Sequence, residues 1–280
     1  MLRKLEAKNM NVVWNHPYFK LIRVSDEDKT NLKPFIMING QIEHHIQAIE
    51  TATKLTYPWC YQYSGYYEYD DSIHTPYIFL YDYPIYGVDR KSITIEAFAN
   101  GLVDALENLE LENVDIMGES TGAMIGTMAS KSKRIDNVIA LHAPIYGSVG
   151  LQSERYNQFV KEMMLKEKAV VLALKILIDE QFGYMQTNKY GFDHIEQIAD
   201  ISKILFTTSN LLETKSKNAL GNFLADIIYT YFGLASDGVI TFDKERMDKE
   251  GLSYEVEHGV SHFDIGSTNY TAQYYKRLTK

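Results

Sequence analysis

The sequence predicts an α/β protein in which a mostly parallel sheet is covered by helices on both faces. Short apolar runs of strand length alternate with segments of helical periodicity between residues 34 and 142. Each apolar run is followed within two residues by Gly, Pro, Asn or Asp, which favour turns. Strands that alternate with helices pair in parallel through crossover connections. We therefore expect a ligand site beyond the carboxyl ends of these strands.

Four strands and three helices are expected in this part of the chain. The predicted strands are the apolar runs at residues 34–38, 77–81, 114–117 and 138–142. The predicted helices, in which apolar residues recur at helical spacing, cover residues 42–49, 98–109 and 124–128. The residues expected at the carboxyl edge of the sheet are Asn39 and Gly40, Asp82, Gly118 to Ser120, and His142 and Ala143.

The pattern changes after residue 150. One apolar stripe at helical spacing runs from Phe159 to Ile178, and a second runs from Ile195 to Leu205. Because roughly 75 residues are too many for a simple loop, we expect residues 151–226 to form a helical insertion. Apolar runs of strand length return at residues 227–232 and 252–256. The predicted organisation is an α/β core from residues 1–150 and 227–280, with residues 151–226 as a helical cap or lid.

Composition narrows the class of protein. Of the 280 residues, 45% are apolar and 23% are charged, so the chain can bury a core. A net charge of −9, from 28 basic and 37 acidic residues, argues against a nucleic-acid-binding protein. The single cysteine excludes an internal disulfide and a cysteine-based zinc cluster. The first residues lack the apolar stretch of a secretory signal, and the most apolar run, residues 169–178, is interrupted by Lys175 and is about half of a membrane span. We expect a cytoplasmic protein with no integral membrane segment.

Residues 118–122 read Gly-Glu-Ser-Thr-Gly and fit the pattern G-x-S-x-G. The motif lies between a predicted strand and a predicted helix, which is the setting of a nucleophile elbow. In such an elbow the serine occupies a tight turn with strained dihedral angles, and a side chain at either flanking glycine would clash. The turn lifts the serine to the N-terminus of the helix, where free N–H groups and the helix dipole favour negative charge. Ser120 is therefore the candidate nucleophile.

A serine hydroxyl needs a base to become a nucleophile, and the base needs an acid that orients it. With this kind of elbow the acid and then the histidine follow the serine along the chain. The histidines downstream of the elbow are His142, His194, His258 and His262. His142 is too close, at the end of the next strand, and His194 lies in the predicted insertion. His262 is the preferred base and His258 the alternative, because small residues between them supply a loop that brings His262 back over the sheet.

Asp237 is the candidate acid. It stands in the sequence Ala-Ser-Asp-Gly-Val at residues 235–239, after the strand predicted at residues 227–232. Its carboxylate would accept the Nδ1–H of His262 and stabilise the imidazolium. Asp243 is the alternative, although its place at the head of the sequence Asp-Lys-Glu-Arg also suits an exposed helix cap.

Two backbone N–H groups are expected to form an oxyanion hole. One belongs to Thr121, the residue after the nucleophile, and the other comes from the loop after the strand that ends at Ile38. That loop reads Asn39-Gly40-Gln41, and the N–H of Gln41 is the candidate because Gly40 lets the backbone approach closely. No cofactor and no metal ion are expected.

Together these segments resemble the α/β-hydrolase superfamily, and within it the lipase-like serine esterases. The elbow at residues 118–122 matches, the Asp-Gly turn at residues 236–239 is similar to the turn that holds the acid in many lipases, and residues 261–264 resemble their terminal histidine loop. Asn39 stands where many lipases have histidine, which leaves a main-chain donor at Gln41 unaffected. The resemblance covers residues 34–147 and 227–280, and family members carry a cap or lid where residues 151–226 are inserted.

The residues and the resemblance together imply a serine ester hydrolase that works through an acyl-enzyme. A small-molecule ester is the expected substrate, and the Met, Phe, Leu and Ile residues of the predicted cap favour an apolar acyl group. The alternatives are an acyltransferase or peptidase that uses the same three residues, or a non-catalytic binding protein of the same fold. Nothing in the sequence indicates the oligomeric state.

Overall fold

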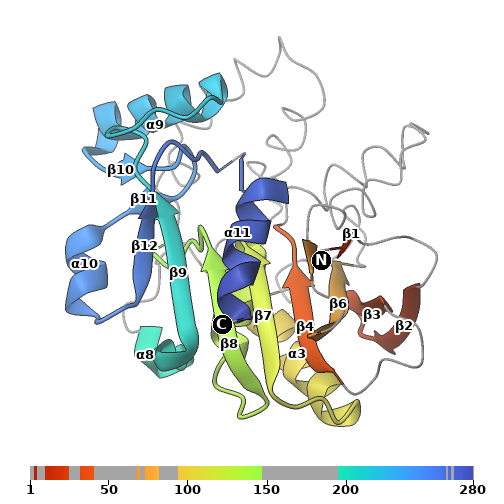
Figure 1. The fold of residues 1–280 in the computed structure, drawn as a ribbon. Coiled ribbons are helices and arrows are strands. Elements are labelled where there is room, and N and C mark those ends of the chain that lie inside the picture. Colours follow the sequence, from red (N-terminus) through yellow and green to blue (C-terminus); the bar gives the residue numbers. More distant parts are fainter. Residues whose placement is uncertain are drawn as a thin grey trace.

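A computed structural model describes most of the chain. The described residues are 3–4, 10–24, 32–40, 68–69, 73–81, 94–146, 195–262, 264–265 and 268–279. The described residues form an eight-stranded sheet with the strand order β12-β9-β8-β7-β4-β6-β3-β2 (Figure 1). Its strands are β2 (Met10–Asn15), β3 (Phe19–Val24), β4 (Lys33–Ile38), β6 (His74–Tyr81), β7 (Val114–Glu119), β8 (Ile135–Leu141), β9 (Ile204–Ser209) and β12 (Tyr254–Glu257).

The six strands from β12 to β6 are parallel, whereas β3 and β2 at one end pair antiparallel. Two small ribbons stand apart from this sheet: β1 (Arg3–Lys4) pairs with β5 (Glu68–Tyr69), and β10 (Ala235–Ser236) pairs with β11 (Thr241–Phe242). The described helices are α3 (Ile95–Asn108), α4 (Thr121–Ala129), α8 (Ile195–Ile198), α9 (Ala219–Phe232), α10 (Lys244–Lys249) and α11 (Thr268–Leu278). The predicted class, a mostly parallel sheet with helices, is confirmed.

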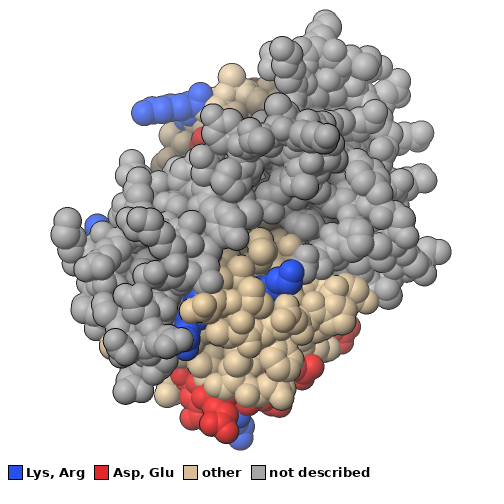
Figure 2. Space-filling model, turned by 90° about the vertical axis from the view of Figure 1, so that its right-hand side faces the viewer, with Lys and Arg blue, Asp and Glu red and all other residues tan. Residues whose placement is uncertain are grey.

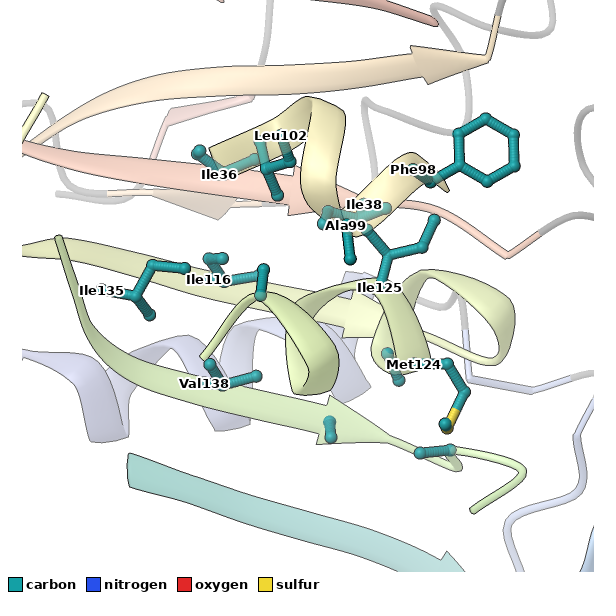
Figure 3. Close-up of a cluster of buried hydrophobic side chains, with 14 of the residues drawn as sticks. Ile36, Ile38, Phe98, Ala99, Leu102, Ile116, Met124, Ile125, Ile135 and Val138 are labelled. Carbon is teal, nitrogen blue, oxygen red and sulfur yellow. The ribbon is translucent and has the colours of Figure 1, made fainter. Parts of the chain in front are cut away.

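Helices cover both faces of the sheet. On one face α3 and α4 pack against β4, β7 and β8, and Figure 3 shows Leu102 and Ile125 of these helices among Ile36, Ile116 and Val138 of the strands. On the other face α11 lies across the strands (Figure 1), where its tyrosines pack against apolar side chains of β4 and β7. Each such buried aliphatic side chain contributes about 1.5–3 kcal/mol to folding. The two cores hold the carboxyl ends of β4, β7 and β8 side by side.

The strands predicted at residues 34–38, 77–81, 114–117 and 138–142 correspond to β4, β6, β7 and β8, and the strand predicted at residues 252–256 overlaps β12. The helices predicted at residues 98–109 and 124–128 correspond to α3 and α4. The helix predicted at residues 42–49 lies outside the described residues.

The strand predicted at residues 227–232 is wrong, because these residues form the second half of α9. Asn218 caps the N-terminus of this helix through its side chain, and Gly233 ends it with a φ of +70°. Along the helix Ile228 is buried while Tyr229 is 54% exposed, which is the pattern of a helix with one face on the protein. A short run of β-branched and aromatic residues cannot be distinguished from a helical segment by its periodicity alone.

The helix predicted from Ile195 to Leu205 is also mostly wrong. Only α8 and a short 3-10 turn, Ile201–Lys203, are helical, and Leu205 lies in β9. Strand β9 pairs with β8 on one side and with β12 on the other, so the sheet resumes at Ile204, inside the segment predicted as a cap. The cap expected over the preceding part, residues 151–194, lies outside the described residues and stays a prediction.

The described part of the surface in Figure 2 has Asp and Glu side chains gathered along its lower edge, while Lys and Arg side chains are scattered. No helix among the described residues combines the length and the hydropathy that a membrane-spanning segment requires.

Candidate active site

The elbow predicted around Ser120 forms between β7 and α4. Ser120 has φ 51° and ψ −118°, a strained conformation for a residue with a side chain. A Cβ atom at Gly118 would lie 2.4 Å from the carbonyl oxygen of Gly122, and one at Gly122 would lie 2.2 Å from the carbonyl oxygen of Ile38. Both glycines are therefore required for steric reasons, as the sequence predicts. The contact between Gly122 and Ile38 also brings the elbow against the end of β4.

His262 lies beside the serine. Its Nε2 atom is 3.0 Å from Ser120 Oγ, and its Nδ1 atom is 2.8 Å from Asp237 Oδ2. The backbone N–H of His262 also donates to the carbonyl oxygen of Asp237 at 2.9 Å. The carboxylate and the imidazole are buried, and the serine is partly exposed. The structure thus brings together the three residues that the sequence singles out from positions 120, 237 and 262.

Asp237 lies in the tight turn between β10 and β11. Its Oδ1 atom accepts the backbone N–H groups of Val239 and Ile240 at 2.9 and 2.7 Å. Burial on its own would raise the pKa of this carboxyl, but the charge and the hydrogen bonds of His262 and His142 outweigh burial and hold the pKa well below its usual range. Asp237 is therefore ionised at neutral pH and fixed by hydrogen bonds to both oxygens.

The loop that carries His262 is held by an internal acceptor. The Oδ2 atom of Asp264 accepts the backbone N–H of Ser261 at 2.8 Å and the hydroxyl groups of Ser261 and Ser216 at 2.7 and 2.6 Å. These bonds attach the residue before His262 to the segment after β9. The loop of His262, the candidate base, is thus held by a carboxylate that the sequence analysis did not assign.

The expected oxyanion donors are described in part. Thr121 is the first residue of α4, so its backbone N–H has no acceptor within the helix. Gln41 lies outside the described residues. The two residues before it are anchored: Tyr81 Oη donates to the carbonyl oxygen of Asn39 at 3.0 Å, and the N–H of Gly40 donates to Glu119 Oε1 at 3.2 Å. The loop after β4 is therefore attached to β6 and to the residue before the nucleophile.

The two alternatives are not brought to the serine. Asp243 caps α10, where its side chain accepts the backbone N–H of Arg246 at 3.0 Å. His258 is exposed at the end of β12. His194, another histidine downstream of the elbow, lies outside the described residues.

Besides Asp264, sequence reasoning missed His142. Its Nδ1 atom lies 2.6 Å from Asp237 Oδ2, so both imidazoles contact the same carboxylate oxygen. The sequence places His142 at the carboxyl edge of the sheet, but proximity to Ser120 along the chain excluded it as the base. That exclusion does not bear on a contact with the acid, which stands 95 positions further along the chain.

Two imidazole nitrogens and a carboxylate oxygen are also ligands that zinc prefers, and these three atoms lie within 4.8 Å of one another. The oxygen is 2.6 and 2.8 Å from the nitrogens of His142 and His262. Ligands of a tetrahedral zinc ion would be about 3.3 Å apart. The distances fit hydrogen bonds better than metal coordination.

No protein-family model and no curated protein match the chain. Solved structures do match. Naproxen esterase (carboxylesterase NP) from Bacillus subtilis is 13% identical with a TM-score of 0.50, over 100% of this chain and 92% of that one. The mature lipase BlEst2 of Bacillus licheniformis is 15% identical with a TM-score of 0.53, over 95% and 99%. A structure from a study of carboxylesterases of the thaumarchaeon Nitrososphaera gargenis is 12% identical with a TM-score of 0.51, over 96% of both chains. Together with the strand order and the elbow, this likeness shows that the chain has the α/β-hydrolase fold.

Proposed function

We propose that this protein is a serine hydrolase that cleaves carboxylic esters through an acyl-enzyme. The observation that carries the proposal is the chain of hydrogen bonds from Ser120 Oγ through His262 to Asp237, with distances of 3.0 and 2.8 Å. These are the distances at which an imidazole can take the hydroxyl proton while a carboxylate stabilises the resulting charge. The strained backbone of Ser120 supports the proposal, since strain of this kind gathers at active sites.

In the acylation step, Ser120 Oγ attacks the carbonyl carbon of the ester while His262 Nε2 takes the hydroxyl proton. Asp237 stabilises the imidazolium through its hydrogen bond to Nδ1. The negative charge on the carbonyl oxygen is stabilised by the N–H of Thr121 and, in our proposal, by the N–H of Gln41. When the tetrahedral intermediate collapses, the alkoxide leaves and receives the proton from His262.

In the deacylation step, water attacks the acyl group on Ser120. His262 removes a proton from this water and returns it to Ser120 Oγ when the acyl-enzyme breaks. The products are a carboxylic acid and the free enzyme. This step uses Ser120, His262, Asp237 and the same oxyanion hole as the first.

Support for the substrate class comes from the similar structures and from the predicted cap. Two of the similar structures are named as a carboxylesterase and a lipase, which favours ester substrates. The apolar residues expected in the cap favour an apolar acyl group. Acyl transfer and peptide hydrolysis would use the same acyl-enzyme and differ only in the acceptor or in the leaving group.

The test is labelling with a fluorophosphonate probe, which reacts with activated serines. The wild-type protein, Ser120→Ala and the control Ser202→Ala are compared; Ser202 is an exposed serine that bonds Asp200. We expect labelling of the wild type and of the control and none of Ser120→Ala. A series of p-nitrophenyl esters of increasing acyl length then gives the preferred acyl group. If folded wild type is neither labelled nor hydrolyses these esters, the proposal fails and the non-catalytic alternative replaces it.

A further inference from the structure

Two histidines share one oxygen of the acid in the candidate active site. His142 Nδ1 is 2.6 Å and His262 Nδ1 is 2.8 Å from Asp237 Oδ2. The other oxygen, Oδ1, accepts two backbone N–H groups from the same turn. The carboxylate therefore accepts four hydrogen bonds, and the second imidazole has no part in the three-residue mechanism given above.

We propose that His142 is a positioning residue, which holds Asp237 Oδ2 in place for His262 and shares the charge of that carboxylate with it. The inference deepens the proposed function and rests on it. It concerns how the acid is held, and His142 itself does not touch the reacting atoms.

The hydrogen bonds fix the protonation of His142. An ionised carboxylate only accepts hydrogen bonds, so each Nδ1 atom that contacts Oδ2 carries a proton. His142 is consequently protonated on Nδ1. Its Nε2 atom is buried and has no hydrogen-bond partner among the described residues. The contact with Asp237 is thus the one polar contact of this ring in the described part of the chain.

A buried nitrogen without a partner is costly and uncommon, so an apolar side chain would suit this position better if only packing mattered. The backbone leads to the same conclusion. His142 has a φ of +47°, in the left-handed region, and its N–H donates to the carbonyl oxygen of Thr207 at 3.0 Å. A strained conformation and an unpartnered ring nitrogen are both kept at a residue whose side chain reaches the acid.

The surroundings of His142 define which charges act on it. Asp237 faces it from the turn between β10 and β11, and His262 faces it from the loop after β12. The ring of Tyr270 on α11 meets the His142 ring edge-on, with 5.9 Å between the ring centroids. Tyr270 Oη bonds Thr207 Oγ1 on β9, and burial raises the pKa of this tyrosine well above its usual value, so it is neutral. The carboxylates Glu119 and Glu257 act on the Tyr270 hydroxyl from β7 and β12. Among the described residues, the carboxylate in direct contact with His142 is that of Asp237.

Sharing the oxygen has a chemical consequence. Each N–H that bonds Oδ2 withdraws part of its negative charge, so less of it remains to stabilise the His262 imidazolium. Removal of His142 should therefore free the carboxylate to rotate, which slows the reaction, and should move the acid limb of the pH–rate profile to higher pH.

Three variants separate positioning from packing. His142→Asn keeps an N–H donor near the place of Nδ1, His142→Phe keeps a ring of similar size against Tyr270 without a donor, and His142→Ala removes both. His258→Ala is the matched control, because His258 is exposed and lies in the segment that leads to the same loop. Thermal unfolding of each variant shows whether it is folded.

For a soluble p-nitrophenyl ester, we expect kcat to fall about 10- to 100-fold in the Ala and Phe variants with KM within about twofold of the wild type. The acid limb should move to higher pH in both. The Asn variant should recover most of kcat, and the control should match the wild type. If Phe is as active as Asn, or if Ala loses rate with an unchanged acid limb, then His142 only fills space and the inference is overturned.

A readout that does not need turnover keeps this inference distinct from the proposed function. In the NMR spectrum of ¹⁵N-histidine-labelled protein, two hydrogen-bonded Nδ1–H protons should appear far downfield. His142→Asn should remove one of them and leave the signal of His262, whereas His142→Ala should shift or broaden the remaining signal. A single downfield signal in the wild type would overturn the inference. Both signals in a protein that the fluorophosphonate does not label would instead contradict the proposed function.

Discussion

Gly221 and Ser261 lie in direct contact, and a Cβ atom at Gly221 would be 2.4 Å from Ser261 Cβ. Gly221 is in the first turn of α9, and Ser261 is the residue before His262. The turn that carries Asp237 is part of the same contact, since a Cβ at Gly238 would lie 2.6 Å from the carbonyl oxygen of Gly221. The N-terminus of α9 thus supports the loop of the base and the turn of the acid at one point.

This contact predicts that Gly221→Ala reduces activity. An alanine in an ordinary helix stabilises a protein by about 0.5–1 kcal/mol relative to glycine. Here we expect a loss of about 1–3 kcal/mol, because the methyl group forces Ser261 away. The same displacement should lower kcat for ester hydrolysis. Urea unfolding together with steady-state kinetics checks both effects, and a variant more stable than the wild type would show that the contact is looser than described.

The choice between the two candidate acids predicts different effects of the same substitution. Asp237→Asn should lower kcat by about 10³- to 10⁴-fold, because an amide cannot stabilise the imidazolium and favours the wrong tautomer of His262. Asp243→Asn should leave activity near that of the wild type, since asparagine caps a helix about as well as aspartate. The assay is hydrolysis of a p-nitrophenyl ester. Loss of activity in the second variant but not in the first would contradict the assignment of the acid.

Asp264 predicts a graded effect on the loop of the base. Asp264→Ala removes the acceptor of three hydrogen bonds, whereas Ser216→Ala removes one of its donors. We expect kcat to fall about tenfold or more in the first variant and clearly less in the second, because small displacements of a general base are costly. Equal activity of Asp264→Ala and the wild type would mean that the loop is held by other contacts.

Asp115, a buried carboxylate near the amino end of β7, predicts how the free energy of unfolding changes at acid pH. Asp115 Oδ1 lies 2.8 Å from Lys33 Nζ and accepts a hydrogen bond from the side-chain amide of Asn137. Asp115 Oδ2 lies 3.1 Å from His74 Nε2. Burial would raise the pKa of Asp115, but the hydrogen bonds of His74, Lys33 and Asn137 outweigh it and lower the pKa. A carboxyl whose pKa is lowered in the folded state stabilises the fold at pH values above the pKa of the same carboxyl in the unfolded chain, about 3.9. That contribution is lost as the pH falls through the folded pKa.

Asp115→Asn should therefore lower the free energy of unfolding at pH 7 by about 3–5 kcal/mol, since it leaves buried partners uncompensated. The difference from the wild type should begin to shrink below about pH 4, where the carboxyl of the unfolded chain becomes protonated, and should continue to shrink as the pH falls through the lower pKa of the folded carboxyl. The control is Asp136→Asn, at a half-exposed carboxylate that also pairs with Lys33 and should contribute less than about 1 kcal/mol. Urea titrations at several pH values measure these differences. A gap between wild type and Asp115→Asn that does not change with pH would contradict this account.

The first half of the fold could be predicted because its strands are buried on both faces. Such strands are continuous apolar runs, and the run at residues 34–38 and the one at residues 114–117 both end at turn residues. The second half could not be predicted in the same way. The run at residues 227–232 has strand propensity, but the caps at Asn218 and Gly233 and its packing on the protein make it a helix. Short apolar runs carry no local information that separates these outcomes.

Only the residues of the candidate site that belong to a sequence motif, or to the chain order that goes with it, could be predicted. The pattern around Ser120 identifies the elbow, and the order of acid and base along the chain points to Asp237 and His262, which the structure brings together. The contact of His142 with Asp237 joins residues 95 positions apart and depends on the pairing of β8 with β9, which the sequence analysis did not find. The role predicted for Gln41 stays a prediction, because that residue lies outside the described residues.

Strand β12 forms one edge of the sheet and leads directly into the loop of His262. Among the described strands, β12 has a neighbour on one side only, β9, so it can open locally at a lower free energy than the centre of the sheet. Opening of this edge would withdraw His262 from Ser120 while β4, β7 and β8 remain folded. In a denaturant titration, esterase activity should therefore disappear before the far-ultraviolet circular dichroism signal does. The working lifetime of the protein would then be governed by the strength of one strand pairing instead of the stability of the whole domain.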